Sequence, residues 1–200
     1  DGEVRILREA RPHAGLDGRN RCALQRQLVE EEVLRDLVGV DGVQQLRGVF
    51  TAWEHRYLEV DYIPGVTLAS WRVQNIHLQE SDPVEYARQV VAIVDQLIAI
   101  VEAIHQRGWV FGDLHPGNVL VSDDGTVTML DLEDASRVDS PREPGVRVFQ
   151  YCADKSADAV QADWFAVARC IMMLYFADFE IEAVSPAFWD RCRHRVREVY

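Results

Sequence analysis

The chain has 200 residues, of which 48% are hydrophobic, and it carries a formal net charge of −12 at pH 7. This length and apolar content suit one domain, or two small lobes around a cleft, and they argue against a disordered chain. Because an acidic chain offers no basic surface to a polyanion, DNA and RNA are not expected partners.

The N-terminal third predicts a small antiparallel sheet with one helix. An alternating stretch at residues 4–8 predicts a strand. Apolar residues at helical spacing predict a helix from about residue 22 to residue 37. Two strand-like runs, residues 48–53 and 57–62, flank a polar turn at residues 54–56 and predict a hairpin.

A Pro-Gly pair at residues 64–65 separates this part from a mostly helical remainder. A long helix is expected at residues 84–106, with Ser81 or Asp82 as its N-cap and Pro83 in its first turn. The other expected elements are a hairpin of strands 118–121 and 126–130, an irregular stretch at 131–159, and helices at 163–176 and 187–199.

Cysteine spacing, apolar content and the first residues bear on location. The four cysteines form no Cys-x-x-Cys pair, which argues against a zinc knuckle or a disulfide scaffold and favours a reducing, cytoplasmic location. The longest apolar stretch, residues 90–104, is interrupted by polar residues at helical spacing, so no membrane span is expected. The chain starts at Asp1 without an apolar leader, so we expect no signal peptide and an excerpt of a longer protein.

Three polar residues around the expected 118–130 hairpin carry the strongest chemical signal. Asp113 and Asn118 form the pattern Asp-x-x-x-x-Asn, and Asp131 directly follows the hairpin. Phosphoryl transfer needs such a set, because a carboxylate orients the attacking hydroxyl and hard oxygen ligands hold magnesium against the phosphates. The pattern predicts Asp113 as the catalytic carboxylate and Asn118 and Asp131 as magnesium ligands. The alternative is that the three residues only build turns.

With these residues the sequence resembles the protein-kinase fold, in which Asp-x-x-x-x-Asn lies in the catalytic loop and a later aspartate binds the metal. The resemblance implies an α+β, protein-kinase-like two-lobed fold that binds ATP and Mg²⁺ in its cleft. Residues 1–63 would form an incomplete N-lobe without its Gly-rich loop, and residues 64–200 a mainly helical C-lobe.

The same resemblance implies further nucleotide-binding residues. The only lysine, Lys155, lies beyond the catalytic loop, so no lysine is available to reach the phosphates. Arg8 stands at the position where kinases carry that lysine. Glu30 matches the glutamate that pairs with this cation, or it lies on a solvated helix face. Asp61 and Ile63 match the hinge, where backbone groups bind adenine, or they only end a strand.

Residues on either side of Asp113, and one on a later helix, also match kinase positions. His115 would donate to the transferred phosphate, or it serves a structural role. Asp163 matches an aspartate that braces the catalytic loop, or it caps a helix. Gly112 stands where many kinases carry the arginine that reads an activation-loop phosphate, so control by loop phosphorylation is not expected.

Three segments are together similar to the kinase domain of class III and class IV lanthipeptide synthetases: residues 8–15, 112–116 and 131–135. This resemblance implies that the chain phosphorylates Ser and Thr hydroxyls of a ribosomal precursor peptide. It also implies lyase and cyclase domains in the parent chain as partners.

Two other functions stay open. A small-molecule kinase of the aminoglycoside-phosphotransferase type shares residues 112–116, although the segment that begins at Arg8 favours the lanthipeptide function. A pseudokinase that binds peptide or nucleotide without transfer would account for Arg8 and the missing Gly-rich loop. Retention of Asp113, Asn118 and Asp131 argues against the pseudokinase.

Overall fold

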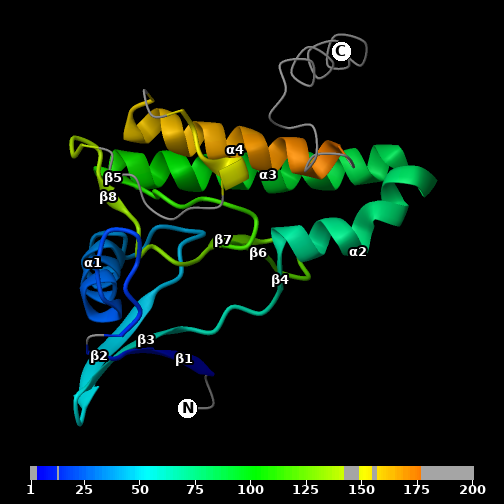
Figure 1. Ribbon diagram of the computed structural model, residues 1–200. Helices are drawn as coiled ribbons and strands as arrows, with labels where there is room; N and C mark the ends of the chain where they lie inside the picture. The colour runs from blue at the N-terminus through cyan, green and yellow to red at the C-terminus, as the bar shows by residue number, and fades with distance from the viewer. Residues whose placement is uncertain (1–3, 13, 142–148, 155–156, 177–200) are drawn as a thin grey trace.

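The computed structural model describes residues 4–12, 14–141, 149–154 and 157–176. It contains both helices and sheets, as the α+β prediction requires. Figure 1 shows a small sheet with a helix beside it, and a second region in which long helices lie side by side. The helix expected at residues 187–199 lies outside the described residues.

The first region is an antiparallel sheet with the strand order β1-β3-β2. Its strands are β1 (Arg5–Ala10), β2 (Leu46–Ala52) and β3 (His55–Asp61), and helix α1 (Ala23–Asp36) packs against it. The expected hairpin is confirmed, but its turn lies at Trp53 and Glu54, because His55 and Arg56 already pair in β3. Trp53 takes a positive φ of 56°, which lets the chain reverse within two residues.

The second region is built on helices α2 (Leu68–Ser81), α3 (Pro83–Gln106) and α4 (Ala159–Tyr175). Strand β4 (Val66–Thr67) pairs with a hairpin of β6 (Val119–Val121) and β7 (Val127–Met129). Strand β5 (Trp109–Val110) pairs with β8 (Ser136–Arg137), and a 3₁₀ turn, η1, spans Phe149–Tyr151. The predicted boundary at residues 63–64 falls in the irregular segment between β3 and β4.

Helix α3 forms where its periodicity predicts it, within one residue at its N-terminus. Asp82, and not Ser81, is the N-cap, because its side chain accepts the N–H of Glu85 at 3.0 Å. One face of the helix is buried in the core: Tyr86, Val90, Ile93, Leu97, Ile100, Val101 and Ile104. Across the described ranges, no helix is both long enough and apolar enough to cross a membrane.

Two helices differ from the sequence prediction. Helix α4 begins four residues before the expected Asp163, because Asp158 and Gln161 form a capping box at its start. Helix α2 was not predicted. It buries only Leu68 and Arg72, so it lacks the apolar stripe that reveals a helix in a sequence.

The two regions are joined by main-chain contacts of Gly42 and Val43, which lie between α1 and β2. The carbonyl of Gly42 accepts the N–H of Met129 at 2.7 Å, and Val43 forms a parallel bridge with the same residue. Gly42 has a φ of +76°, and a Cβ there would collide with the side chain of Ile100. Buried side chains of both regions therefore form one continuous core.

Side chains from α2 and α3 cap the C-terminal end of α4. Arg72 and Gln79 donate to the carbonyls of Met173 and Tyr175 at 3.3 and 3.1 Å, and the hydroxyl of Tyr86 donates to Leu174 at 2.6 Å. Because the last carbonyls of a helix have no partner within the helix, these bonds satisfy groups that would otherwise be buried alone.

We predict that Tyr86→Phe destabilises the protein by about 1–2 kcal/mol, because it leaves the Leu174 carbonyl without its buried donor. Chemical unfolding followed by circular dichroism measures this change. The matched control is Tyr62→Phe, whose ring is 51% exposed. Equal unfolding free energies for Tyr86→Phe and the wild type would contradict the prediction.

Candidate active site

A buried carboxylate on α4 binds the main chain of the loop that carries Asp113. Asp163, 2% exposed in the first turns of α4, accepts the main-chain N–H groups of Phe111 and Gly112 at 2.7 and 3.0 Å. His105 contacts the same carboxylate at 2.9 Å. The structure therefore gives Asp163 the bracing position, and the capping alternative is wrong because Asp158 is the N-cap of α4.

The Asp113 loop is closed by its own polar groups. The amide of Asn118 donates to the carbonyl of Asp113 at 3.1 Å, and its main-chain N–H donates to His115 at 2.9 Å. The N–H of Gly117 lies 3.1 Å from Nδ1 of His115, so Nδ1 is the acceptor and Nε2 carries the proton in a neutral ring. Nε2 is 3.9 Å from Oδ2 of Asp113. Asp113 and His115 thus lie side by side.

The hairpin places Asn118 and Asp131 at the same end. Leu130 donates its main-chain N–H to the carbonyl of Asn118 at 2.8 Å, so Asp131 follows directly after the residue that pairs with Asn118. Asp131 has a φ of +64°, in the left-handed region that few residues other than glycine adopt. Such backbone strain is concentrated at functional sites.

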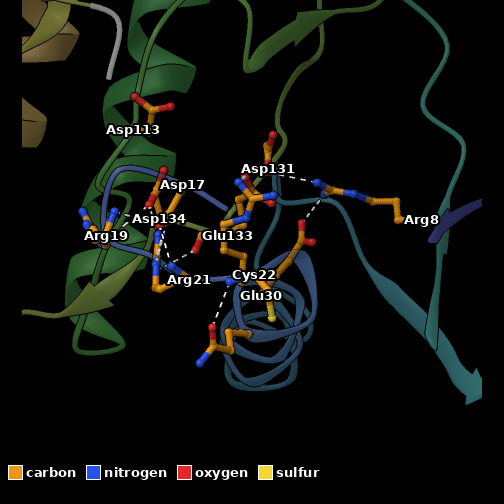
Figure 2. Close-up of polar contacts among 12 residues, drawn as sticks. Arg8, Asp17, Arg19, Arg21, Cys22, Glu30, Asp113, Asp131, Glu133 and Asp134 are labelled. Carbon is orange, nitrogen blue, oxygen red and sulfur yellow. Dashed lines mark hydrogen bonds and ion pairs between the residues drawn. The ribbon is translucent and has the colours of Figure 1, made fainter. Parts of the chain in front are cut away.

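Arg8 connects Asp131 to helix α1. Its guanidinium donates to Oδ1 of Asp131 at 3.0 Å and forms a second ion pair with Glu30, as Figure 2 shows. Glu30 is only 2% exposed, whereas Glu31 contacts Arg35 and Arg56 at the surface of α1. The alternative that Glu30 lies on a solvated face is therefore wrong.

Electrostatics at this point is dominated by an excess of carboxylates. Burial raises the pKa of Glu30 to about 7 against the opposing charge of Arg8, and the charges of Asp131 and Glu133 add to the increase. Burial alone would lower the pKa of Arg8, but the surrounding carboxylates outweigh it and raise the pKa. The pKa of Glu133 is raised by burial and by the charge of Asp131. Arg8 pairs with Glu30 and Asp131, and Arg26 pairs with Glu133, so three acidic groups face two guanidinium groups.

The two predicted hinge residues lie away from this cluster, at the end of β3. The side chain of Asp61 binds Arg47 at 2.6 and 2.8 Å and also pairs with Arg5, and these contacts lower its pKa. Its N–H donates to Gln45, and its carbonyl accepts from Gln44 at 2.6 Å. A carbonyl oxygen has two lone pairs, so that of Asp61 keeps one for another donor. Ile63 is half-buried in the segment that follows β3.

Sequence reasoning missed three arginines that meet the Asp131 loop. Arg19 and Arg21 contact Asp134, and Arg26 contacts Glu133 at 3.4 Å. The only signal was a group of arginines near residue 20 and a group of acids after residue 130. Nothing in the sequence indicated that these two groups meet.

Asn118 and Asp131 fit a magnesium ion better than a metal bound by protein alone. Within the described ranges, no group of three or more His, Cys, Asp or Glu side chains is able to hold a metal ion. Magnesium commonly takes one or two oxygen ligands from the protein and the rest from phosphates and water. Asp131, whose carboxylate is exposed, directly follows the residue that pairs with Asn118, so the two residues offer one carboxylate and one amide oxygen from the same end of the hairpin.

Comparisons with known proteins find one matching family and several similar proteins. The model of the protein kinase domain family matches residues 16–181. A Streptomyces coelicolor protein named Probable SapB synthase is 32% identical over 176 residues, which cover 86% of this chain and 19% of that relative. The family match and this relative bear out the resemblance to the kinase domain of lanthipeptide synthetases.

Two further relatives are named as kinases. The Probable serine/threonine-protein kinase PknB of Lactococcus lactis is 27% identical over 97 residues, which cover 48% of this chain and 13% of the relative. The Serine/threonine-protein kinase PksC of S. coelicolor is 28% identical over 116 residues, which cover 57% and 20%, respectively. The chain therefore spans at most 20% of the length of each of these three curated relatives.

We predict that Glu30 makes stability fall as the pH rises. Its pKa is about 7 in the folded chain and near 4.5 when unfolded, so only the folded state binds this proton in between. The contribution of this proton to the free energy of unfolding is complete below pH 4.5 and is lost as the pH rises through 7. Its slope is at most about 1.4 kcal/mol per pH unit.

Unfolding curves of the wild type and Glu30→Gln, measured in EDTA at several pH values, test this dependence. The stability of the wild type relative to the variant should decline between pH 5 and 7. Parallel pH profiles for the two proteins would show that Glu30 is already ionised at the lower pH.

Proposed function

Because this chain belongs to the protein kinase domain family, whose members are phosphotransferases, we propose that it transfers the γ-phosphoryl group of ATP to a hydroxyl at Asp113. The single observation that carries the proposal is the hairpin that holds Asn118 and Asp131 together beside the braced Asp113 loop. Protein kinase domains in general use ATP with Mg²⁺.

Each polar group of the site has a part in this reaction. The carboxylate of Asp113 would accept the hydrogen bond of the attacking hydroxyl and orient it. Nε2–H of His115, beside that carboxylate, is available to a phosphate oxygen. Asn118 and Asp131 would hold magnesium, which supplies charge neutralisation at the phosphates when it is bound.

Arg8 and Glu30 would act on the nucleotide side. A guanidinium that is paired with a buried glutamate has its position fixed, yet it keeps donors for phosphate oxygens. Arg8 reaches both Glu30 and Asp131, so an arginine spans the distance at which kinases use lysine. Retention of this contact favours a working site over a pseudokinase. The carbonyl of Asp61 and the backbone groups of Ile63 would bind adenine.

The acceptor that we propose is a serine or threonine hydroxyl of a ribosomal precursor peptide during lanthipeptide biosynthesis. The support is the similarity to the Probable SapB synthase, which extends over 86% of this chain. The parent protein would then carry lyase and cyclase domains, which turn the phosphorylated residues into dehydro residues and add cysteine thiols to them. We expect this chemistry in the cytoplasm.

We predict that Asp131→Asn lowers the rate of phosphoryl transfer at least about 100-fold, because an amide cannot supply the anionic ligand for magnesium. Asp113→Asn should lower kcat by a factor of about 10²–10⁴ and leave nucleotide affinity unchanged. Transfer from radiolabelled ATP measures both variants in the full-length protein.

The matched control is Asp123→Asn, which changes an exposed aspartate in the turn of the same hairpin. It should retain wild-type turnover. If Asp131→Asn or Asp113→Asn is as active as this control, the assignment of the site is wrong.

We also predict that the full-length protein phosphorylates serine or threonine in a leader-bearing precursor peptide and leaves aminoglycosides unmodified. The net charge of −12 would itself suit a polycationic aminoglycoside, so charge does not distinguish the two acceptors. Mass spectrometry should show phosphate added to the peptide when only the kinase acts, and net loss of water when a lyase is active. If only an aminoglycoside is phosphorylated, the proposed peptide acceptor is wrong, whereas the roles proposed for Asp113, Asn118 and Asp131 stand.

A further inference from the structure

The residues directly after Asp131 are bound to a segment far away in the sequence. Arg21 forms an ion pair with Asp134 and reaches the carbonyl of Glu133 at 3.5 Å, as Figure 2 shows for the carboxylate contact. Arg19 lies 3.6 Å from the Asp134 carboxylate. These arginines lie in the segment that connects β1 to α1, so this segment binds the loop that follows Asp131.

The position of Arg21 is itself fixed by Asp17. One carboxylate oxygen of Asp17 accepts the main-chain N–H groups of Arg19 and Arg21, each at 2.8 Å, and the other accepts Nε of Arg21 at 2.8 Å. The N–H of Asp17 donates to the carbonyl of Arg21 at 3.0 Å, and Asn20 completes the turn with a φ of +57°. Burial alone would lower the pKa of Arg21, but its bonds to Asp17 and Asp134 raise it. A charged guanidinium is therefore held in one orientation.

Asp134 touches the Asp113 loop on its other side. Gly112 packs so closely on the Asp134 carbonyl that a Cβ at Gly112 would overlap it, and its φ of +87° also favours glycine. Gly112 directly precedes Asp113, and Asp134 lies three residues after Asp131. Asp134 is thus placed between the arginines and both loops of the site.

We propose that Arg21, acting through Asp134, is a positioning residue that fixes the Asp131 loop against the Asp113 loop. This inference rests on the proposed phosphoryl transfer and adds to it how the two loops keep their separation. The charge that holds Asp134 comes from an arginine of the chain itself. Catalysis depends steeply on such separations, because a displacement of about 1 Å lowers the rate about 100-fold.

Steady-state kinetics of the full-length protein test the proposal. Arg21→Ala should lower kcat about 10- to 100-fold and raise the magnesium concentration required for half-maximal rate, while KM for the peptide changes less than about twofold. Arg21→Lys, which keeps the charge and loses the fork, should fall between Arg21→Ala and the wild type. Arg88→Ala, which breaks an exposed pair with Glu85 on α3, is the matched control and should be unchanged.

A double-mutant cycle shows whether Arg21 acts through Asp134. Asp134→Asn should lower kcat as Arg21→Ala does, and the double variant should be no slower than the slower single one. If the two losses multiply, or if kcat of Arg21→Ala stays within about twofold of the wild type, the proposal is overturned. Thermal unfolding of each variant identifies any loss of folded protein, and Arg21→Lys and Asp134→Asn then carry the test.

Nucleotide binding separates this inference from the proposed acceptor. Calorimetric titration with ADP, in magnesium and in EDTA, reports the metal-dependent gain in affinity without any peptide. Arg21→Ala should reduce this gain relative to the wild type and Arg88→Ala. A wild type that shows the gain but phosphorylates no peptide would refute the acceptor, whereas an equal gain in Arg21→Ala would refute the role of Arg21.

Discussion

The guanidinium of Arg8 joins three parts of the chain that are far apart in the sequence. It extends from β1, pairs with Glu30 of α1, and reaches Asp131 after β7. A buried carboxylate that loses its cation destabilises a protein by about 3–5 kcal/mol, because its charge is then left without compensation. The register of β1, the rotation of α1 and the path of the loop after β7 are therefore coupled through one side chain.

The acidic groups around Arg8 also favour the binding of a cation. Glu30 and Asp131 share Arg8, Glu133 lies close enough to add its charge, and the pKa of Glu30 and that of Glu133 are raised. A divalent cation at Asp131 would reduce the repulsion among these groups and leave Arg8 available to phosphate oxygens. Two features that look separate, a buried glutamate and an exposed aspartate, are thus parts of one charge balance.

The Asp113 loop is fixed by groups outside the set that would touch a substrate. Asp163 holds the main chain at Phe111 and Gly112 from α4, and Gly112 rests on the Asp134 carbonyl. The carboxylate of Asp163 is buried, and the N–H groups that it accepts stabilise its charge. The separation of the Asp113 and Asp131 loops therefore depends on main-chain packing as much as on the polar side chains.

Local patterns in the sequence predicted most of the helices and strands and proposed the residues of a site. Each of these patterns occupies one continuous stretch of chain: the periodicity of α3, the turn composition of the 118–130 hairpin, and the spacing of Asp113, Asn118 and Asp131. They predicted the helix, the hairpin and a phosphoryl-transfer site. Helix α2 was missed because its burial is confined to two residues, so no apolar period marks it.

Only the tertiary structure decided which residues meet. Sequence alone left Glu30 open between a solvated face and an ion pair, and its burial against Arg8 settled that question. Likewise, Arg21 and Asp134 are separated by 113 positions, and no local propensity relates them. Periodicity and capping act over a few residues, whereas burial and charge pairing depend on how the whole chain packs. For this reason the sequence determined what chemistry the chain carries, and the fold determined how that chemistry is held in place.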